Sequence, residues 1–186
     1  MRKLHRAATV IAALAIVGLA APTAPAAAAE PVNQHCVAQA NVDNPQAVCF
    51  DTFTKALQFA SGGVLYELPK GSSVSARVDA LNAGFGVNVV RTVISIEYTG
   101  SNYTGSDLIW TGTSGNCSTP TGNVDYFASS MPAGWDNVIS SFKTYANCWD
   151  KHHENTNFGG ASVGYEPSRS YIGGAMDNRT SSHRWS

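Results

Sequence analysis

The sequence predicts a mainly β fold, a small antiparallel sandwich that follows an export signal and a short α+β extension. Only 13% of the residues are charged, and Gly, Ser, Thr and Asn are abundant, as in secreted β-rich domains. From Val89 onward the apolar pattern alternates with a period of two, which is typical of strands. The same stretch contains two pairs of repeated motifs, which predict two similar halves.

Residues 1–29 predict a secretory signal peptide. Arg2, Lys3 and Arg6 precede an uninterrupted apolar run over residues 7–21, and small residues end the segment at Ala29. The run of about 15 residues is short for a membrane span, and no later segment has a comparable one. We therefore expect a secreted, extracellular protein with no membrane association.

The mature chain is expected to be a single acidic domain with an N-terminal extension. Cleavage near Ala29 leaves about 157 residues, which fits one domain. The mature part keeps all 13 acidic residues and loses three of the 12 basic ones, so the formal charge falls from −1 to −4. This charge argues against nucleic acid as a partner.

Four cysteines lie in the exported part, an even number that predicts disulfides outside the cytoplasm. We favour Cys36–Cys49 and Cys117–Cys148, since each pair then lies within one segment of the chain. Loops of this size contribute roughly 3–4 kcal/mol each in the chain-entropy description. A zinc site is disfavoured because the chain has no Cys-x-x-Cys spacing.

Residues 30–91 predict an α+β extension made of a hairpin and one or two helices. The turn signal Asp43-Asn44-Pro45 lies between Cys36 and Cys49, so residues 30–50 are expected to form a disulfide-closed hairpin.

Two helices and one strand are expected after this hairpin. Residues 52–60 place Phe53, Leu57 and Ala60 on one helical face, with Asp51 as the expected N-cap and Gly62-Gly63 at the end. Residues 64–68 form a short strand candidate, and a second helix is expected over residues 74–82.

The β domain is expected over residues 92–186, after a boundary near residues 84–92. Its first strand places Val93, Ser95 and Glu97 on one face and Ile94, Ile96 and Tyr98 on the other.

A degenerate two-fold repeat occupies residues 93–186. An aromatic-x4-aromatic-x-Gly frame runs from Tyr98 to Gly105, and His153 to Gly160 repeats it with His153 in the first aromatic place. Two six-residue loops follow, with four of six positions identical: Asp136-Asn137-Val138-Ile139-Ser140-Ser141 and Asp177-Asn178-Arg179-Thr180-Ser181-Ser182. The first half carries an insertion of about 14 residues, which contains Cys117.

The repeat resembles the βγ-crystallin Greek key domain in the form found in secreted bacterial proteins. Both elements of that family, the aromatic hairpin and the Asn/Asp-Asn/Asp-x-x-Ser/Thr-Ser loop, occur twice here and in the right order. The resemblance implies a two-motif Greek key sandwich and covers about 60% of the mature chain. Two departures stand out: His153 replaces the usual Tyr, so looser packing is expected at that corner, and the first motif carries the insertion.

The six-residue loops also have the chemistry of a calcium site. Ca²⁺ takes six to eight oxygen ligands, and each loop offers a carboxylate, an amide carbonyl, hydroxyls and backbone carbonyls. No soft ligand is present, which disfavours zinc and copper. Read as isolated turns, the same residues would only cap their own loops.

What the resemblance implies is a pair of Ca²⁺ sites, each between the loop of one motif and the hairpin of the other. Glu97 and Glu154 are possible additional ligands. The ligands implied for the two sites are Asp136, Asn137, Val138 (carbonyl) and Ser140 for one, and Asp177, Asn178, Arg179 (carbonyl) and Ser181 for the other.

Other chemistries are less well supported by the sequence. His152, His153 and Glu154 are adjacent on a predicted strand, so neighbours point to opposite faces and do not chelate together. No Gly-x-Ser-x-Gly or Gly-rich nucleotide loop is present. Paired carboxylates for glycoside hydrolysis stay open, because sequence does not give their separation. The four tryptophans are expected in the core, with a carbohydrate platform as the alternative.

The function predicted from these observations is calcium binding by a secreted, monomeric, non-catalytic protein. The alternative is inhibition of an extracellular metallopeptidase, because some secreted bacterial relatives of this fold are such inhibitors and a disulfide-clamped loop at residues 111–130 suits that role. An extracellular toxin or antifungal protein is a third possibility within the range of the family.

Overall fold

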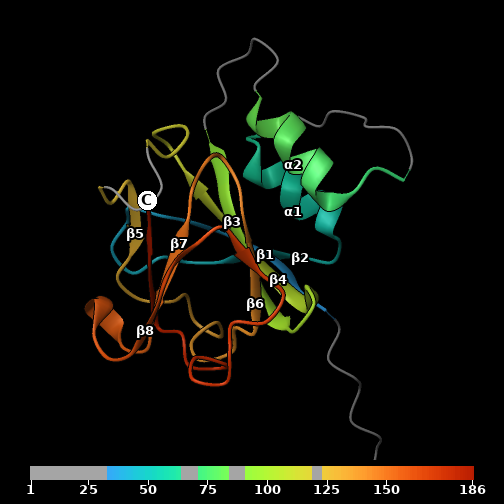
Figure 1. Ribbon diagram of the computed structural model, residues 1–186. Helices are drawn as coiled ribbons and strands as arrows, with labels where there is room; N and C mark the ends of the chain where they lie inside the picture. Colours follow the sequence, from blue (N-terminus) through green and yellow to red (C-terminus); the bar gives the residue numbers. More distant parts are fainter. Residues whose placement is uncertain (1–32, 64–70, 84–90, 119–122) are drawn as a thin grey trace, which may run out of the picture. The chain divides into compact units, whose positions relative to one another are not determined.

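A computed structural model describes residues 33–63, 71–83, 91–118 and 123–186 (Figure 1). The signal peptide expected at residues 1–29, the strand candidate at 64–68 and most of the expected boundary at 84–92 lie outside these residues. Within the described ranges, no helix has both the length and the apolarity needed to cross a membrane.

The described chain forms two β-sheets that together carry ten strands. One sheet has the order β2-β1-β4-β3-β6-β9, and the other has the order β5-β10-β7-β8. The bounds are β1 His35–Gln39, β2 Val48–Phe50, β3 Thr92–Gly100, β4 Thr104–Gly112, β5 Tyr126–Ala128, β6 Ser141–Thr144, β7 Asp150–His153, β8 Ser162–Glu166, β9 Ser168–Arg169 and β10 Ser182–Trp185.

The strand order confirms the predicted two-motif Greek key sandwich. Strands β3, β4 and β6 of the first motif lie in the larger sheet, whereas β5 joins the other sheet beside β10. Strands β7, β8 and β10 of the second motif lie in the smaller sheet, whereas β9 pairs with β6. Each motif therefore gives its third strand to the sheet of the other, which ties the two repeats into one core.

The N-terminal hairpin is part of the larger sheet. Strand β1 pairs antiparallel with β2 and parallel with β4, so the hairpin extends the sheet by two strands. Cys36 and Cys49 are partners in this register and form the expected disulfide. The second expected disulfide, Cys117–Cys148, is also present.

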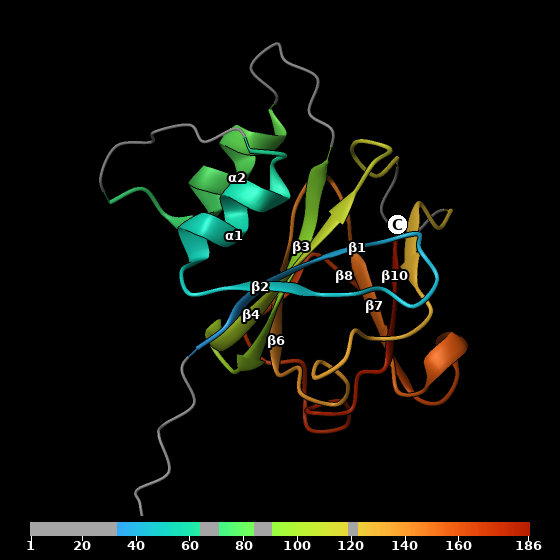
Figure 2. The ribbon, with the colours of Figure 1, turned by 180° about the vertical axis from the view of Figure 1, so that it is seen from behind.

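Two helices cover the face of the larger sheet that points away from the smaller one (Figure 2). They are α1, Phe53–Ala60, and α2, Val74–Asn82, close to the expected ranges. The N-cap of α1 is Thr52, whose hydroxyl accepts a hydrogen bond from the Lys55 N–H. The expectation of Asp51 is wrong, because its carboxylate instead pairs with the Lys55 ammonium at 2.8 Å.

The helices explain why β3 is buried on both faces. Ile96 and Tyr98 pack with buried residues of α1 and α2, while Glu97 points between the two sheets. A β-bulge between Val93 and Ser95 shifts the register, so Val93 joins the helix-facing cluster and Ile94 the cluster between the sheets. The expected alternation therefore holds from Ser95 to Tyr98 but reverses at Val93 and Ile94, as an inserted residue requires.

Aromatic residues fill the space between the sheets. Trp110 and Trp185 are fully buried, with their ring centroids 5.4 Å apart, and Trp135 is 4% exposed. These three tryptophans are core residues as expected, and none of them is available as a carbohydrate platform.

Candidate functional site

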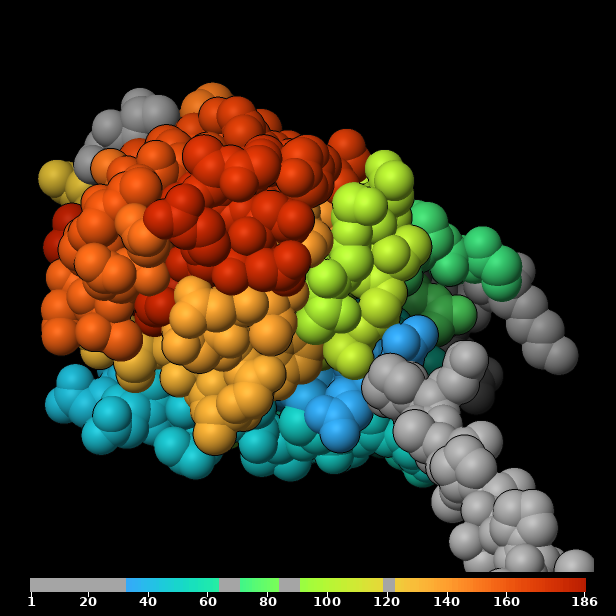
Figure 3. Space-filling view, turned by 90° about the horizontal axis from the view of Figure 1, so that it is seen from below, coloured from blue at the N-terminus to red at the C-terminus, as the bar shows by residue number. Residues whose placement is uncertain are grey.

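The two Asp-Asn-x-x-Ser-Ser loops lie side by side at one end of the sandwich, where Figure 3 shows the first in light orange and the second in red. The Asn137 N–H donates a hydrogen bond to the Thr180 carbonyl at 3.0 Å, and the Asn178 N–H donates to the Ile139 carbonyl at 3.0 Å. The second residue of each loop thus bonds the fourth residue of the other. The repeat seen in the sequence becomes a pair with local two-fold symmetry.

A left-handed backbone at the second loop position explains the repeated asparagine. The φ angle is 58° at Asn137 and 55° at Asn178. Asparagine adopts this region more readily than most residues, because its short side chain can bond locally. The asparagine pair therefore fixes the turn shape that lets the two loops meet.

The last serine of each loop holds the aromatic hairpin of its own motif. The Ser141 hydroxyl accepts from the Tyr103 N–H at 3.0 Å and donates to the Gly100 carbonyl at 2.6 Å. In the second motif, the Ser182 hydroxyl accepts from the Phe158 N–H at 3.0 Å and donates to the Asn155 carbonyl at 2.6 Å. Each hydroxyl uses its proton and one lone pair to hold the hairpin.

The aromatic corners of the two hairpins are equally well packed. The rings of Tyr98 and Tyr103 meet edge to face with centroids 5.7 Å apart, and those of His153 and Phe158 do so at 5.8 Å. His153 therefore takes the aromatic place as expected. The expectation of looser packing there is wrong, because the imidazole makes the same edge contact as the tyrosine ring.

The first loop places several of its predicted ligands in contact with each other and with the second loop. Asp136 and Asn137 are exposed, and the Asn137 amide donates to the Asp136 carboxylate at 2.9 Å. The Ser181 hydroxyl of the second loop donates to the side-chain oxygen Oδ1 of Asn137 at 3.4 Å. Ser140 and Ser181 are buried, and Val138 is half-buried. The division of the eight predicted ligands between two ions stays a prediction.

The second loop carries two shielded oxygen atoms and one cation. Within the described part of the chain, Asp177 Oδ1 and Thr180 Oγ1 are buried and have no hydrogen-bond partner. Arg179 forms an ion pair with Glu154 and also donates to the Ala175 carbonyl at 2.9 Å. Hydrogen bonds from the Ala161 N–H and from Arg179 lower the pKa of Glu154. The two loops are therefore alike in backbone but differ in charge, because the first has Val138 in place of the arginine.

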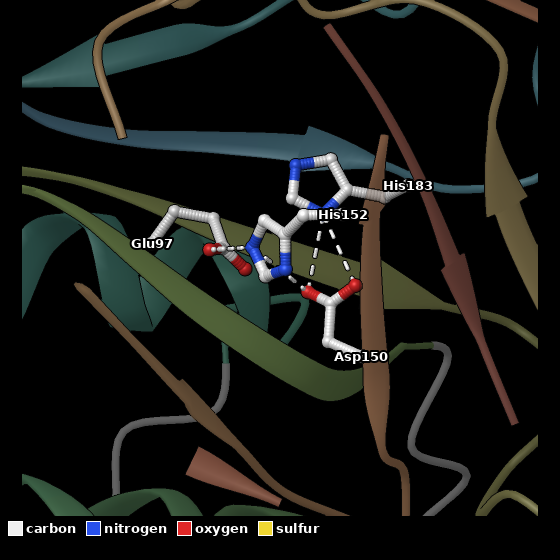
Figure 4. Close-up of side chains that lie close together, drawn as sticks. All are labelled: Glu97, Asp150, His152 and His183. Atoms are coloured by element: carbon white, nitrogen blue, oxygen red, sulfur yellow. Dashed lines mark hydrogen bonds and ion pairs between the residues drawn. The ribbon is translucent and has the colours of Figure 1, made fainter. Parts of the chain in front are cut away.

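A second group of polar side chains lies between the two sheets (Figure 4). Glu97 comes from β3, Asp150 and His152 from β7, and His183 from β10. All four residues are fully buried, and one potential ligand atom from each lies within 4.8 Å of the others. We call these four residues the core cluster. Glu97, considered from the sequence as an additional calcium ligand, belongs to this cluster.

Short polar contacts connect the members of the core cluster. His152 Nε2 lies 3.0 Å from Glu97 Oε2 and 3.7 Å from Asp150 Oδ2, and His183 Nδ1 lies 3.1 Å from both Asp150 oxygens. The Ser95 hydroxyl donates to Glu97 Oε1 at 2.7 Å.

Burial dominates the electrostatics of the core cluster. Desolvation raises the pKa of Glu97 and of Asp150, because it disfavours their charged forms. Desolvation lowers the pKa of His152 to about 3. It also acts to lower the pKa of His183, but the adjacent Asp150 carboxylate outweighs it and raises that pKa overall.

The core cluster was not predicted from the sequence, although one signal was present. Asp150 and His152 are two residues apart on a strand and therefore share a face. Glu97 and His183 come from strands distant in sequence, and their approach depends on the packing of one sheet on the other. Glu154 lies at the surface with Arg179 and has no part in the cluster.

Among the comparisons with known proteins, the search of solved structures gives matches. No protein-family model matches the chain, and no curated protein matches it. One solved structure that matches is a double mutant of a βγ-crystallin domain from Clostridium beijerinckii, with 19% sequence identity and a TM-score of 0.37. The match covers 50% of this chain and 97% of that chain. A βγ-crystallin domain from Flavobacterium johnsoniae matches with 19% identity, coverages of 50% and 93%, and a TM-score of 0.37. The N-terminal domain of Protein S matches with 14% identity, coverages of 50% and 94%, and a TM-score of 0.37.

Proposed function

We propose that this chain is a secreted, non-catalytic monomer that binds calcium at the paired loops of its two Greek key motifs. The reciprocal hydrogen bonds of Asn137 with Thr180 and of Asn178 with Ile139 carry the proposal, since they bring two oxygen-rich loops together. Bound Ca²⁺ would supply positive charge between the loops and hold them to each other and to the hairpins.

The donor set of the loops fits calcium. Carboxylates, amide oxygens, hydroxyls and backbone carbonyls are the hard oxygen ligands that Ca²⁺ prefers. Asp177 Oδ1 is shielded from solvent without a partner, and an orphaned carboxylate oxygen is what a bound cation would satisfy. Ser141 and Ser182 are not among the proposed ligands, and their hydroxyls hold the hairpins.

An extracellular location would make moderate affinity sufficient. The basic and apolar N-terminal segment and the two disulfides support export. Extracellular calcium modules commonly have dissociation constants of about 10⁻⁴–10⁻³ M. At about 1 mM Ca²⁺ and a dissociation constant of about 10⁻⁴ M, binding stabilises the folded state by roughly 1.4 kcal/mol per site.

Calorimetric titration of the mature protein tests the proposal. We expect two bound Ca²⁺ and a melting temperature that rises by several degrees in millimolar Ca²⁺. The double variant Asp136→Ala, Asp177→Ala should abolish binding, whereas Asp51→Ala, an exposed carboxylate of the extension, should not change it. A melting curve that is identical in EDTA and in millimolar Ca²⁺ would contradict the proposal.

Peptidase inhibition is the second candidate function, and the tethering of the inserted loop supports it. The Tyr126 hydroxyl donates to the Gly115 carbonyl at 2.6 Å and accepts from the Ser114 N–H at 2.9 Å. The Cys117 N–H donates to the Ala146 carbonyl at 2.9 Å, beside the disulfide to Cys148. A loop fixed in this way loses little entropy when it binds a partner. Rates of extracellular peptidases with and without the protein would test this candidate.

A further inference from the structure

The core cluster places two carboxylates in a region closed to bulk solvent. Glu97 and Asp150 are 0% exposed, and among the described residues the basic groups within ion-pair distance of them are two imidazoles. An uncompensated buried carboxylate is costly, so the pair must be neutralised by protons or by a cation. With neutral histidines, the cluster has a formal charge of −2, which one divalent ion cancels.

The spacing of the ligand atoms approaches that of a tetrahedral metal site. Ligands at about 2.0–2.2 Å from Zn²⁺ lie about 3.3–3.6 Å from each other. The measured contacts are 3.0 Å between His152 and Glu97, 3.7 Å between His152 and Asp150, and 3.1 Å between His183 and Asp150. Since the largest separation among the four atoms is within 4.8 Å, small side-chain rotations would complete the site.

Aromatic rings pack against both histidines of the cluster. The Phe142 ring lies 4.3 Å from the His152 ring, and the Trp185 ring stacks on His183 at 5.1 Å with an interplanar angle of 4°. Within the described residues, His152 Nδ1 and His183 Nε2 are buried and have no hydrogen-bond partner. These are not the nitrogens that face the carboxylates, which are His152 Nε2 and His183 Nδ1, so an ordered water is the partner they call for.

The repeat shows that these groups are not required by the fold. Alignment of the motifs places Phe142 of the first at the position of His183 in the second, and Ser95 at the position of Asp150. The Greek key closes with Phe and Ser at those positions in its first half. The second motif therefore carries a histidine and a carboxylate that packing alone does not demand.

We propose that the core cluster binds one divalent transition-metal ion of the zinc class, through one nitrogen each of His152 and His183 and one oxygen each of Glu97 and Asp150. Imidazole nitrogens and carboxylate oxygens both bind Zn²⁺, and four ligands is the number that Zn²⁺ takes in closed tetrahedral sites. Ca²⁺ is a poor match here, because it requires six to eight oxygen ligands. This site is separate from the paired loops and is independent of calcium binding.

Complete burial means that the metal enters while the chain folds. The experiment is therefore to refold the mature protein, with its disulfides intact, in the presence of Zn²⁺ or Co²⁺ and then to remove unbound metal with EGTA. We expect one retained metal ion per chain by elemental analysis, a raised melting temperature, and the strong visible absorption of tetrahedral Co²⁺.

Two variants separate the site from its surroundings. His183→Phe restores the residue of the first motif and removes one ligand, and it should weaken metal affinity by more than about 100-fold, since loss of an outer-shell partner alone costs 10–100-fold. The matched control is His153→Tyr, which changes a buried histidine outside the cluster to the residue that the first motif has at that position. This control should retain one equivalent of metal.

Several results would overturn the proposal. One is a wild-type protein that refolds in Zn²⁺ with no retained metal and no shift in melting temperature. Another is a folded His183→Phe protein, judged by circular dichroism, that retains metal as tightly as the wild type. If His183→Phe does not fold, the wild-type Co²⁺ spectrum decides: an octahedral spectrum, or none, contradicts a buried tetrahedral site.

Discussion

The Glu97 carboxylate and the His152 imidazole meet 3.0 Å apart in the core, although they come from equivalent positions of the two motifs. Strands β3 and β7 are the first strands of their motifs, and these residues immediately precede Tyr98 and His153. Two glutamates at this point would face each other as like charges without water. The divergence to Glu and His turns a repulsive contact at the local two-fold axis into an attractive one.

In the loops outside the core, by contrast, the two motifs have the same residues at equivalent positions. Asn137 and Asn178 both need the left-handed backbone, and Ser141 and Ser182 make the same pair of hydrogen bonds to their hairpins. Backbone geometry imposes the same demand on each copy, whereas side chains that meet at the axis must complement each other. The repeat is therefore visible in the loops and lost in the core.

Neighbouring serines of the first loop should have different roles. Ser141→Ala removes the partner of the Tyr103 N–H and of the Gly100 carbonyl, so it should lower the free energy of unfolding by about 1–3 kcal/mol. It should leave two bound Ca²⁺. Ser140→Ala should lower calcium affinity and change the calcium-free melting temperature less. Thermal unfolding and calorimetric titration of both variants check this, and equal loss of calcium-free stability in the two would contradict it.

The sequence predicted those parts of the fold that depend on local pattern. The helix ending before Gly62-Gly63, the disulfide Cys36–Cys49 and the aromatic role of His153 all follow from residues close together in the chain. The paired loops could be predicted because each motif contains the same Asp-Asn-x-x-Ser-Ser sequence, whose asparagine adopts the left-handed backbone.

Features set by contacts between distant strands were not predicted. Strand β1 joins β4 in parallel. The helices pack on the outer face of the larger sheet, so β3 is buried on both faces. The reversal at Val93 and Ile94 depends on a bulge that has no sequence signature here. The core cluster requires Glu97 and His183, 86 positions apart in the numbering, to meet through sheet packing.

Asp107 should make stability depend on pH between about 4 and 6. Its carboxylate is buried 2.6 Å from His35, and burial raises its pKa to about 6 despite that partner. The folded state then holds a proton that the unfolded state releases, so stability should fall as pH rises through this window. In Asp107→Asn this part of the decline should disappear.

Urea unfolding at pH 4, 5, 6 and 7 without calcium measures the effect. The difference in free energy of unfolding between wild type and Asp107→Asn should change across pH 4–6 and then level off. Asp51→Asn serves as the control of opposite sign, because the hydrogen bond from Lys55 lowers the pKa of Asp51. Parallel pH profiles for wild type and Asp107→Asn would refute the assignment.

The disulfide Cys117–Cys148 should matter for the inserted loop and not for the calcium loops. It closes a separation of 31 residues, so the double variant Cys117→Ser, Cys148→Ser should lose about 3–4 kcal/mol of stability. Calcium stoichiometry should stay at two, because no predicted ligand lies within the inserted loop. If the intact protein inhibits a metallopeptidase, the double variant should not inhibit it. Inhibition by the double variant would show that the peptidase contacts a surface other than the inserted loop.

The charge difference between the loops should give the two calcium sites unequal affinities. Arg179 stands in the second loop where the first has Val138, and its ion pair also engages Glu154. A divalent ion and a unit cation about 8 Å apart repel by about 1 kcal/mol in water, and added salt screens this repulsion. Arg179→Val should therefore tighten the weaker site by about five-fold, and Val138→Arg should weaken the other by a similar factor.

The double exchange provides the control, because it should keep two sites while reversing which loop binds more tightly. Calorimetric titration at low salt measures both affinities, and an unchanged titration of Arg179→Val would show that this arginine lies outside the field of either ion.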